Sequence, residues 1–153
     1  MKNLFLLLIL FGLSATTYSC AQAKASQNEI FQASYNSSKA LVKTQMYRFV
    51  GEVVYNNKNR EKLDGNSNSI SINKSKVSGY LPSLSVENKS FNISGSIENY
   101  IISFKDKKQQ IYIEFNVGDA TFYIAVKPNG NAFLTIKDLD ETTTSYTGKL
   151  EKL

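Results

Sequence analysis

The chain has 153 residues, of which 42% are hydrophobic and 20% charged, and its formal net charge is +5. It contains no histidine and a single cysteine, which excludes Ser-His-Asp and Cys-His catalysis and the usual zinc and copper sites. No glycine loop of the phosphate-binding type is present either, so we expect neither a metal nor an organic cofactor.

The first twenty residues have the pattern of an export signal. Met1–Asn3 form a short positive start, and Leu4–Leu13 form an apolar run interrupted only by Gly12. This run is shorter than the roughly 20 residues that a membrane-spanning helix needs, so it predicts a signal peptide. We therefore expect an exported protein of the periplasm or outer membrane.

Two cleavage sites compete at the end of this signal. Ser19 followed by Cys20 resembles a lipobox, in which the cysteine is acylated and becomes the new N-terminus, although the two residues before Ser19 depart from the usual pattern. The alternative is an ordinary signal-peptidase site at Ala21–Ala23, with cleavage after Ala23. Because Cys20 is the sole cysteine, we favour residues 1–20 as a lipoprotein signal and the membrane as a partner through a lipid on Cys20.

About 130 residues remain after this signal, which is the usual size of one domain. Residues 21–28 are mostly small and polar, as in a tether, and we expect a single β-rich domain over residues 29–153. The spacing of Ile30, Tyr35 and Leu41 predicts a helix at its start, most strongly from Ser38 to Gln45.

From Met46 onward the hydrophobic period changes to two, which indicates strands. In the first of them, Tyr47, Phe49, Gly51, Val53 and Tyr55 would share the buried face. Residues 56–68 are polar and are expected to form a loop. Further strands are expected around Ile70–Ile72, Val77–Leu81, Phe91–Gly95 and Tyr100–Phe104.

The strongest alternation lies in the C-terminal third, where turns separate Ile111–Val117, Phe122–Val126 and Ala132–Ile136, and a last strand runs from about Thr143 to Leu150. Asn129-Gly130 is a strong hairpin signal because both residues tolerate positive φ. The pattern predicts a mainly β fold: an antiparallel meander of about eight strands forming a barrel or a sandwich, with one N-terminal helix over an opening or a face.

Several segments in this order resemble domain-of-unknown-function family 4251 over essentially the whole chain. They follow the lipoprotein-type signal and the helix: Tyr47-Arg48-Phe49, Val77–Pro82, Phe91–Gly95, Glu98-Asn99-Tyr100 and Pro128–Ala132. The resemblance implies a small exported, often lipid-anchored protein of the Bacteroidetes and implies no catalytic residues. One departure is the short, plain segment Ser83–Glu87, where the family has an aromatic, glycine-rich loop.

Two tyrosines are the candidate ligand-binding residues. Tyr112 and Tyr123 alternate with the aliphatic residues of their strands, so they are expected on the same side of adjacent strands. Tyrosine combines a flat ring with a hydroxyl, which suits a platform for sugar or peptide. The competing interpretation is a cross-strand pair that only stabilises the sheet.

Carboxylates offer the alternative chemistry. Glu52 and Glu114 lie on polar faces of predicted strands, and paired acids can hydrolyse glycosides without histidine if their strands are neighbours. Basic residues cluster only at Lys58–Lys62 and Lys105–Lys108, each cluster with an acid, and we expect these to be solvated turns.

The sequence thus favours a non-catalytic, exported binding or structural domain with an unidentified protein or small-molecule partner. Nucleic acid is not expected for an exported chain. The second hypothesis is a periplasmic hydrolase, or an inhibitor of one, that uses carboxylates. A third is a lipid carrier, which would require an open interior lined by Ile111, Ile113, Ile124 and Leu134.

Overall fold

The structure is a computed structural model that describes residues 25–56, 58–64, 67–84, 90–138 and 143–153. Within these ranges no helix is long and apolar enough to cross a membrane. The helices are α2 (Gln27–Lys43) and the short 3-10 helix η1 (Asp106–Lys108). The strands are β1 (Met46–Tyr55), β2 (Arg60–Lys62), β3 (Ser69–Asn73), β4 (Lys76–Pro82), β5 (Ser90–Ser96), β6 (Glu98–Lys105), β7 (Gln110–Val117), β8 (Ala120–Val126), β9 (Asn131–Lys137) and β10 (Thr143–Lys152).

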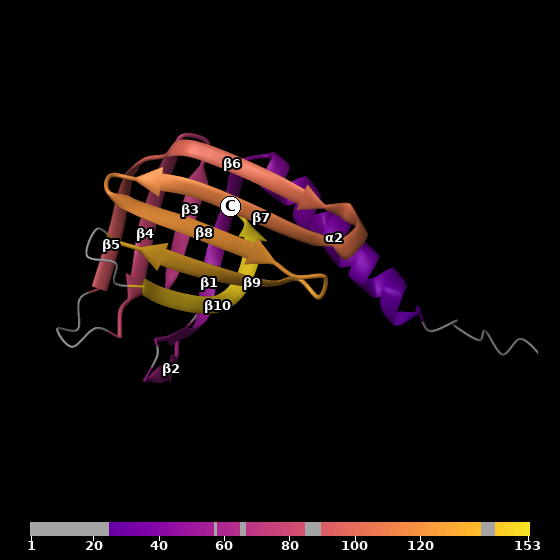
Figure 1. The fold of residues 1–153 in the computed structure, drawn as a ribbon, viewed down its shortest axis with the longest axis horizontal. Coiled ribbons are helices and arrows are strands. Elements are labelled where there is room, and N and C mark those ends of the chain that lie inside the picture. Colours follow the sequence, from indigo (N-terminus) through magenta and orange to yellow (C-terminus); the bar gives the residue numbers. More distant parts are fainter. Residues whose placement is uncertain (1–24, 57, 65–66, 85–89, 139–142) are drawn as a thin grey trace, which may run out of the picture.

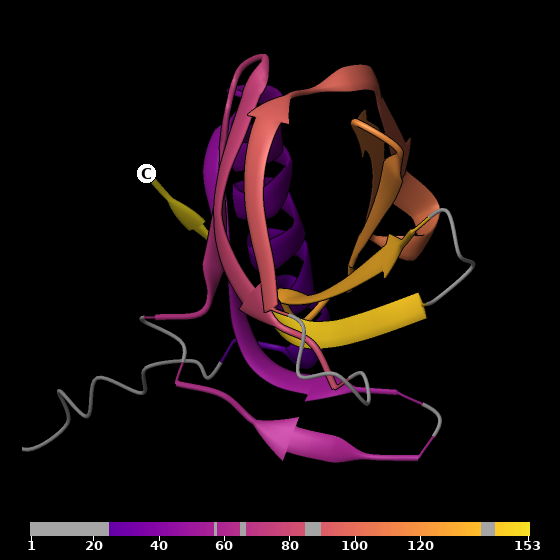
Figure 2. The same ribbon diagram turned by 90° about the vertical axis from the view of Figure 1, so that its left-hand side faces the viewer.

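One antiparallel sheet curls into a nearly closed barrel (Figures 1 and 2). The strand order is β5-β4-β3-β1-β10-β9-β8-β7-β6, and β2 pairs only with β1. A single residue, Ile97, separates β5 from β6. One extended segment therefore pairs with β4 through its first half and with β7 through its second, which brings the two ends of the sheet together. The predicted mainly β fold with one N-terminal helix is confirmed, and the barrel is the correct alternative.

The helix α2 begins at a capping box. Ser26 Oγ accepts the Glu29 backbone N–H at 3.3 Å, and Glu29 Oε2 accepts the Ser26 N–H at 2.7 Å. This cap supports first turns that hydrophobic spacing alone predicts poorly. The helix ends at Lys43, and Gln45 with a φ of 53° turns the chain into β1, so the expected continuation to Gln45 was wrong by two residues.

Side chains of α2 fix it to the turn between β6 and β7. The buried Tyr35 donates its hydroxyl to Asp106 Oδ1 at 2.6 Å, and Lys39 forms a salt bridge with the same oxygen. The hydrogen bond from Lys39 lowers the pKa of the Asp106 carboxyl and raises that of the Lys39 ammonium. Lys39 also lies 5.0 Å above the ring of Phe104. The helix thus covers the end of the barrel where η1 lies.

The barrel interior is filled by side chains of alternating strand residues. The largest fully buried ones include Tyr47, Phe49, Phe115, Phe122 and Tyr146. The aliphatic set that a lipid carrier would need is 0–1% exposed and belongs to the same packed cluster: Ile111, Ile113, Ile124 and Leu134. A small barrel closed in this way packs its interior with side chains. The filling counts against the lipid-carrier hypothesis.

Buried tyrosine hydroxyls find partners inside this core. The hydroxyls of Tyr47 and Tyr100 share a hydrogen bond of 2.8 Å, and Tyr146 donates to the carbonyl oxygen of Pro82 at 2.9 Å. Burial raises the pKa of all three phenols. These hydroxyls remain protonated and act as hydrogen-bonding groups of the core.

A bulge in β1 reverses which of its side chains are buried. The register between β1 and β10 shifts between Gly51 and Val53, so Val54 is buried while Val53 and Tyr55 face outward. The prediction that Val53 and Tyr55 share the buried face of Tyr47 was therefore wrong. One extra residue in a strand moves every later side chain to the opposite face.

The same bulge changes the neighbour of β1. β3 pairs with Met46–Val50, whereas β2 pairs with Val53–Tyr55. Two backbone hydrogen bonds stabilise this change of pairing partner from β3 to β2. The Gly51 N–H donates to the Asn68 carbonyl, and the Leu63 N–H donates to the Glu52 carbonyl, each at 2.8 Å. The prediction of a loop over residues 56–68 was thus wrong for β2, a short hairpin arm beside the barrel.

Candidate functional site

Tyr112 and Tyr123 project from the outside of the barrel. β7 and β8 pair so that Tyr112 is opposite Ala125 and Glu114 is opposite Tyr123, which makes the two tyrosines diagonal neighbours on one face. Their exposed fractions are 40% and 42%. The expected placement on the same side of adjacent strands is therefore present, while ligand binding by the pair stays a prediction.

The two tyrosines line a depression of about 260 Å³, which we call the tyrosine hollow. It crosses β6 to β9, and its outward-facing lining comprises Ile101, Ser103, Tyr112, Glu114, Tyr123, Ala125, Phe133 and Thr135. Ile101 is 58% exposed. The outer face of an antiparallel barrel is expected to be polar, so clustered apolar side chains indicate an interaction site.

A second groove, the arginine hollow, adjoins the first. It has a volume of about 450 Å³, crosses β9, β10, β1 and β2, and is lined by Val53, Tyr55, Asn56, Lys58, Asn59, Arg60, Phe133 and Thr147. Phe133 lines both hollows, so they form one continuous surface. A third hollow of about 580 Å³ shares Val53 and Arg60 and is also lined by Glu52, Lys62 and Leu63.

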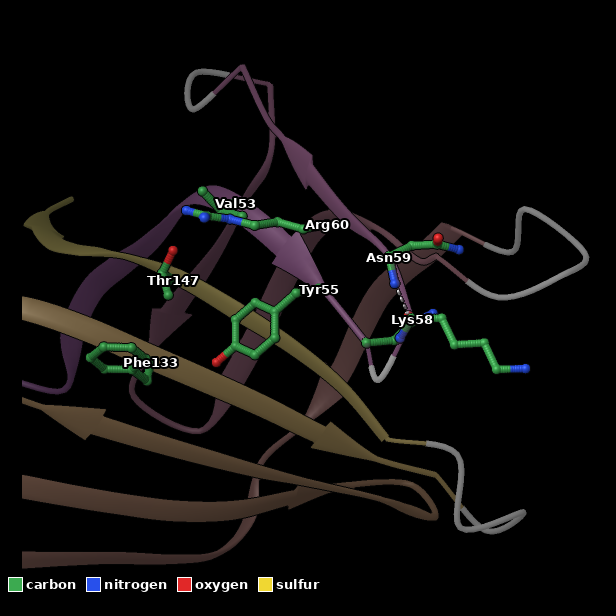
Figure 3. A pocket seen from close by; sticks show the side chains of 8 residues that line it. Val53, Tyr55, Lys58, Asn59, Arg60, Phe133 and Thr147 are labelled. Carbon is green, nitrogen blue, oxygen red and sulfur yellow. Dashed lines mark hydrogen bonds between the residues drawn. The ribbon is translucent and has the colours of Figure 1, made fainter.

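Figure 3 shows how the arginine hollow is built. The Arg60 side chain extends from β2 across β1 to lie beside Val53, and the ring of Tyr55 lies near the centre of the groove. The ammonium group of Lys58 points away from that ring. Arg60 is therefore the cation that faces the groove.

The turn between β1 and β2 is ordered by Asn56. Its Oδ1 accepts the backbone N–H groups of Lys58 and Asn59 at 2.9 and 2.8 Å, and its Nδ2 donates to the Leu84 carbonyl at 2.9 Å. An asparagine that bonds its own backbone in this way favours a tight turn. The turn brings Arg60 directly opposite Tyr55 in the β1–β2 pairing.

The chain has two arginines, and their environments differ. Arg48 donates through Nε and Nη2 to Glu151 Oε2 at 3.1 and 2.6 Å. Arg60 has no carboxylate within salt-bridge distance among the residues that the structure describes. Its guanidinium is available to a ligand.

Sequence reasoning missed the arginine hollow because it placed Tyr55 in the core and Arg60 in a solvated turn. One signal was present: Gly51 interrupts an otherwise strong strand, and an isolated glycine in a strand often marks a bulge. A bulge at Gly51 would have moved Tyr55 to the outer face. The pairing of β2 with β1 had no comparable signal.

The structure does not bring the two candidate acids together. Glu52 lies on β1 and Glu114 on β7, with β10, β9 and β8 between them. Four strand steps of about 4.8 Å correspond to roughly 19 Å along the sheet. A glycosidase needs its two carboxyl groups no more than about 9.5 Å apart. Glu52 instead pairs with Lys149 at 3.4 Å, and Glu114 lines the tyrosine hollow.

Two further expectations concern metal binding and the N-terminus. In the described ranges no three histidine, cysteine, aspartate or glutamate residues form a group able to hold a metal ion. Cys20, the signal and the first half of the predicted tether lie outside the described residues.

Comparisons with known proteins agree with the fold. The crystal structure of a DUF4251 family protein from Bacteroides eggerthii DSM 20697 matches with a TM-score of 0.65 at 19% sequence identity. The match covers 82% of this chain and 92% of that chain and shows a common fold. No curated protein matches the sequence. The model of a domain of unknown function, DUF4251, matches residues 30–150. The resemblance read from the sequence is thus confirmed, and the chain belongs to the DUF4251 family.

Proposed function

We propose that the protein is an exported, lipid-anchored and non-catalytic domain that binds carbohydrate on the outer face of its barrel. The observation that carries the proposal is the tyrosine hollow. Tyr112 and Tyr123 stand about two-fifths exposed on adjacent strands and share a depression with Ile101 and Phe133. A rigid sheet that leaves aromatic rings in water at one place is suited to a ligand that covers them.

Carbohydrate fits this surface better than an extended peptide. β7 lies between β6 and β8, and β8 lies between β7 and β9, so both strands already have partners on each side. A peptide could not add to them as a further strand, and contact must come from side chains. Tyrosine rings offer flat apolar surface to a sugar ring, while Ser103, Glu114 and Thr135 offer polar groups to its hydroxyls.

A binding role rather than catalysis is supported by the residues themselves. The chain has no histidine, and the two acids considered for glycoside hydrolysis lie four strand steps apart. One carboxylate, Glu114, remains in the tyrosine hollow, where it can accept hydrogen bonds from sugar hydroxyls.

Lipid attachment at Cys20 would hold the domain close to a membrane. The helix begins at Gln27, and seven residues of chain reach at most about 25 Å. Feeding cells a fatty-acid analogue should label the wild-type protein and leave Cys20→Ala unlabelled. An unlabelled wild type would contradict the anchor and favour cleavage after Ala23.

The binding proposal is tested with a panel of neutral and acidic tetrasaccharides of gluco, galacto and manno configuration. Tyrosine fluorescence can report binding because the chain has no tryptophan. We expect Tyr112→Ala and Tyr123→Ala each to weaken binding about two- to tenfold, which is the usual worth of one aromatic contact.

The matched control is Tyr80→Ala. Tyr80 is 43% exposed, but it lies on β4, outside the hollows described above. It should leave the affinity unchanged. Equal losses in all three variants, or a loss of stability without a loss of binding at Tyr112 and Tyr123, would assign the two tyrosines to sheet stabilisation instead.

A further inference from the structure

We infer that the arginine hollow binds an acidic sugar, so that the ligand is a glycan ending in a carboxylate-bearing residue of the uronate type. This inference rests on the proposed carbohydrate-binding function and specifies the ligand class. It assigns the neutral part of the glycan to the tyrosine hollow and its acidic end to Arg60.

The shape of the surface fits an elongated ligand. Phe133 joins the tyrosine hollow to the arginine hollow, and Arg60 joins the arginine hollow to the third one. The continuous surface therefore runs across the outside of the barrel from β6 to β2. The arginine hollow alone, at about 450 Å³, lies in the size range of ligand pockets.

The charges along this surface predict the orientation of the bound ligand. Glu114 lies at the tyrosine end, where it would repel a carboxylate. At the opposite end Arg60 has no carboxylate within salt-bridge distance among the described residues, and Glu52, which lines the third hollow, is paired with Lys149. A guanidinium presents two parallel N–H groups to a carboxylate, which gives both affinity and orientation. The acidic sugar is thus expected at the β2 end.

Aromatic side chains beside Arg60 supply the surface for the sugar ring. Tyr55 and Phe133 line the groove, and both are half-buried. Lys127 lies 5.8 Å from the centre of the Phe133 ring, which adds positive charge near the groove. Thr147 contributes a hydroxyl for sugar hydroxyls.

Three structural features converge to form this pocket. The bulge after Gly51 turns Tyr55 outward, β2 replaces β3 as the neighbour of β1, and Asn56 orders the turn that precedes Arg60. Arg48, by contrast, is held by two hydrogen bonds to Glu151, whereas Arg60 lines the groove and has no salt-bridge partner among the described residues.

The test uses two probes that differ at a single carboxyl group: a tetrasaccharide with one terminal glucuronate, and its methyl ester, in which that group is uncharged. The other three sugars of the probe are taken from the neutral tetrasaccharide of the panel that binds most tightly. Wild-type protein should bind the acid roughly tenfold to hundredfold more tightly than the ester, as for a hydrogen bond to a charged group. The preference should decrease as salt is added.

Arg60→Gln should abolish the preference by lowering the affinity for the acid to that for the ester. Arg60→Lys, which keeps the charge without the planar pair of donors, should retain part of it. Arg48→Gln is the matched control and should keep the full preference. Circular dichroism establishes that each variant is folded. The backbone amide NMR signals of β1 and β2 establish that the hairpin arm is intact.

Each outcome decides between the two proposals. Equal binding of acid and ester by the wild type, or a preference that survives in Arg60→Gln, would overturn the acidic-sugar inference and leave carbohydrate binding standing. Binding of neither probe, together with no binding in the neutral panel, would overturn both. Adsorption to phosphatidylglycerol vesicles that depends on Arg60, without a preference between the sugars, would assign the cation to a membrane surface and refute the inference.

Discussion

Substituting Gly148 with alanine tests whether the close approach of β1 and β10 beside the bulge requires glycine. Gly148 lies opposite Gly51, and a Cβ at position 148 would overlap the Val50 carbonyl oxygen. It would also lie 2.9 Å from the Val50 carbonyl carbon and 3.1 Å from Cζ of Phe49. The obstructing atoms include backbone of a paired strand, which cannot rotate aside as a flexible side chain can.

The magnitude follows from two opposing effects. Overpacking of a tightly packed site usually costs about 1–3 kcal/mol, and the involvement of backbone places Gly148→Ala at the upper end of that range. Alanine also restricts the unfolded chain, which offsets about 0.4–1 kcal/mol. We expect a net loss of about 2–2.6 kcal/mol in the free energy of unfolding, or a Tm lower by roughly 8–10 °C for a domain of this size.

The assay is urea and thermal unfolding followed by circular dichroism, with Gly118→Ala as the control. Gly118 has a φ of 56°, but a Cβ there would meet no atom within 4 Å. Its substitution should cost about 1 kcal/mol, from backbone strain alone. If Gly148→Ala is no less stable than Gly118→Ala, the close approach of the two strands does not require glycine and the steric reasoning fails.

Two further predictions concern hydrogen bonds of the core and the helix. Asp106→Asn should lower stability at pH 7 by weakening the contacts of α2 with the β6–β7 turn. Because Lys39 lowers the pKa of the folded-state Asp106, its contribution is present above the unfolded-state pKa of about 3.9 and is lost as the pH falls through the lower folded value. Urea midpoints of the two proteins should therefore converge in acid, and a constant difference down to pH 2 would contradict this. Tyr146→Phe removes the hydrogen bond to the Pro82 carbonyl and should cost about 1–2 kcal/mol in urea unfolding, whereas an unchanged midpoint would show that water replaces the hydroxyl.

The C-terminal meander could be predicted from sequence because local signals agree there. Ile111, Ile113 and Phe115 alternate with polar residues, and Asn129-Gly130 marks the hairpin before β9. All three side chains are at most 1% exposed. The same alternation placed Tyr112 and Tyr123 on the outer face. The tyrosine hollow could therefore be predicted in part from the two-residue hydrophobic period alone.

The arginine hollow could not be predicted in the same way because it depends on long-range pairing. β2 consists of three charged residues, all exposed, so no hydrophobic alternation marks it. Its strand conformation comes from hydrogen bonding to β1, which is available only where the bulge has moved β1 away from β3. Strict alternation of inward and outward side chains along β1, without a bulge, also places Tyr55 on the wrong face.

The filled interior and the bulge together explain why the candidate site lies on the outside of this barrel. With Tyr47, Phe49 and Phe115 packed inside, the barrel leaves its ligand-binding capacity to side chains that point away from the core. Strands β7 to β10 are paired on both sides, so the rings that they carry are held by a continuous hydrogen-bonded sheet. β2 is bonded only to β1 and carries Arg60 at the free end of the arm. A rigid aromatic face beside a more weakly held cation allows the acidic end of a ligand to be adjusted without disturbing the core.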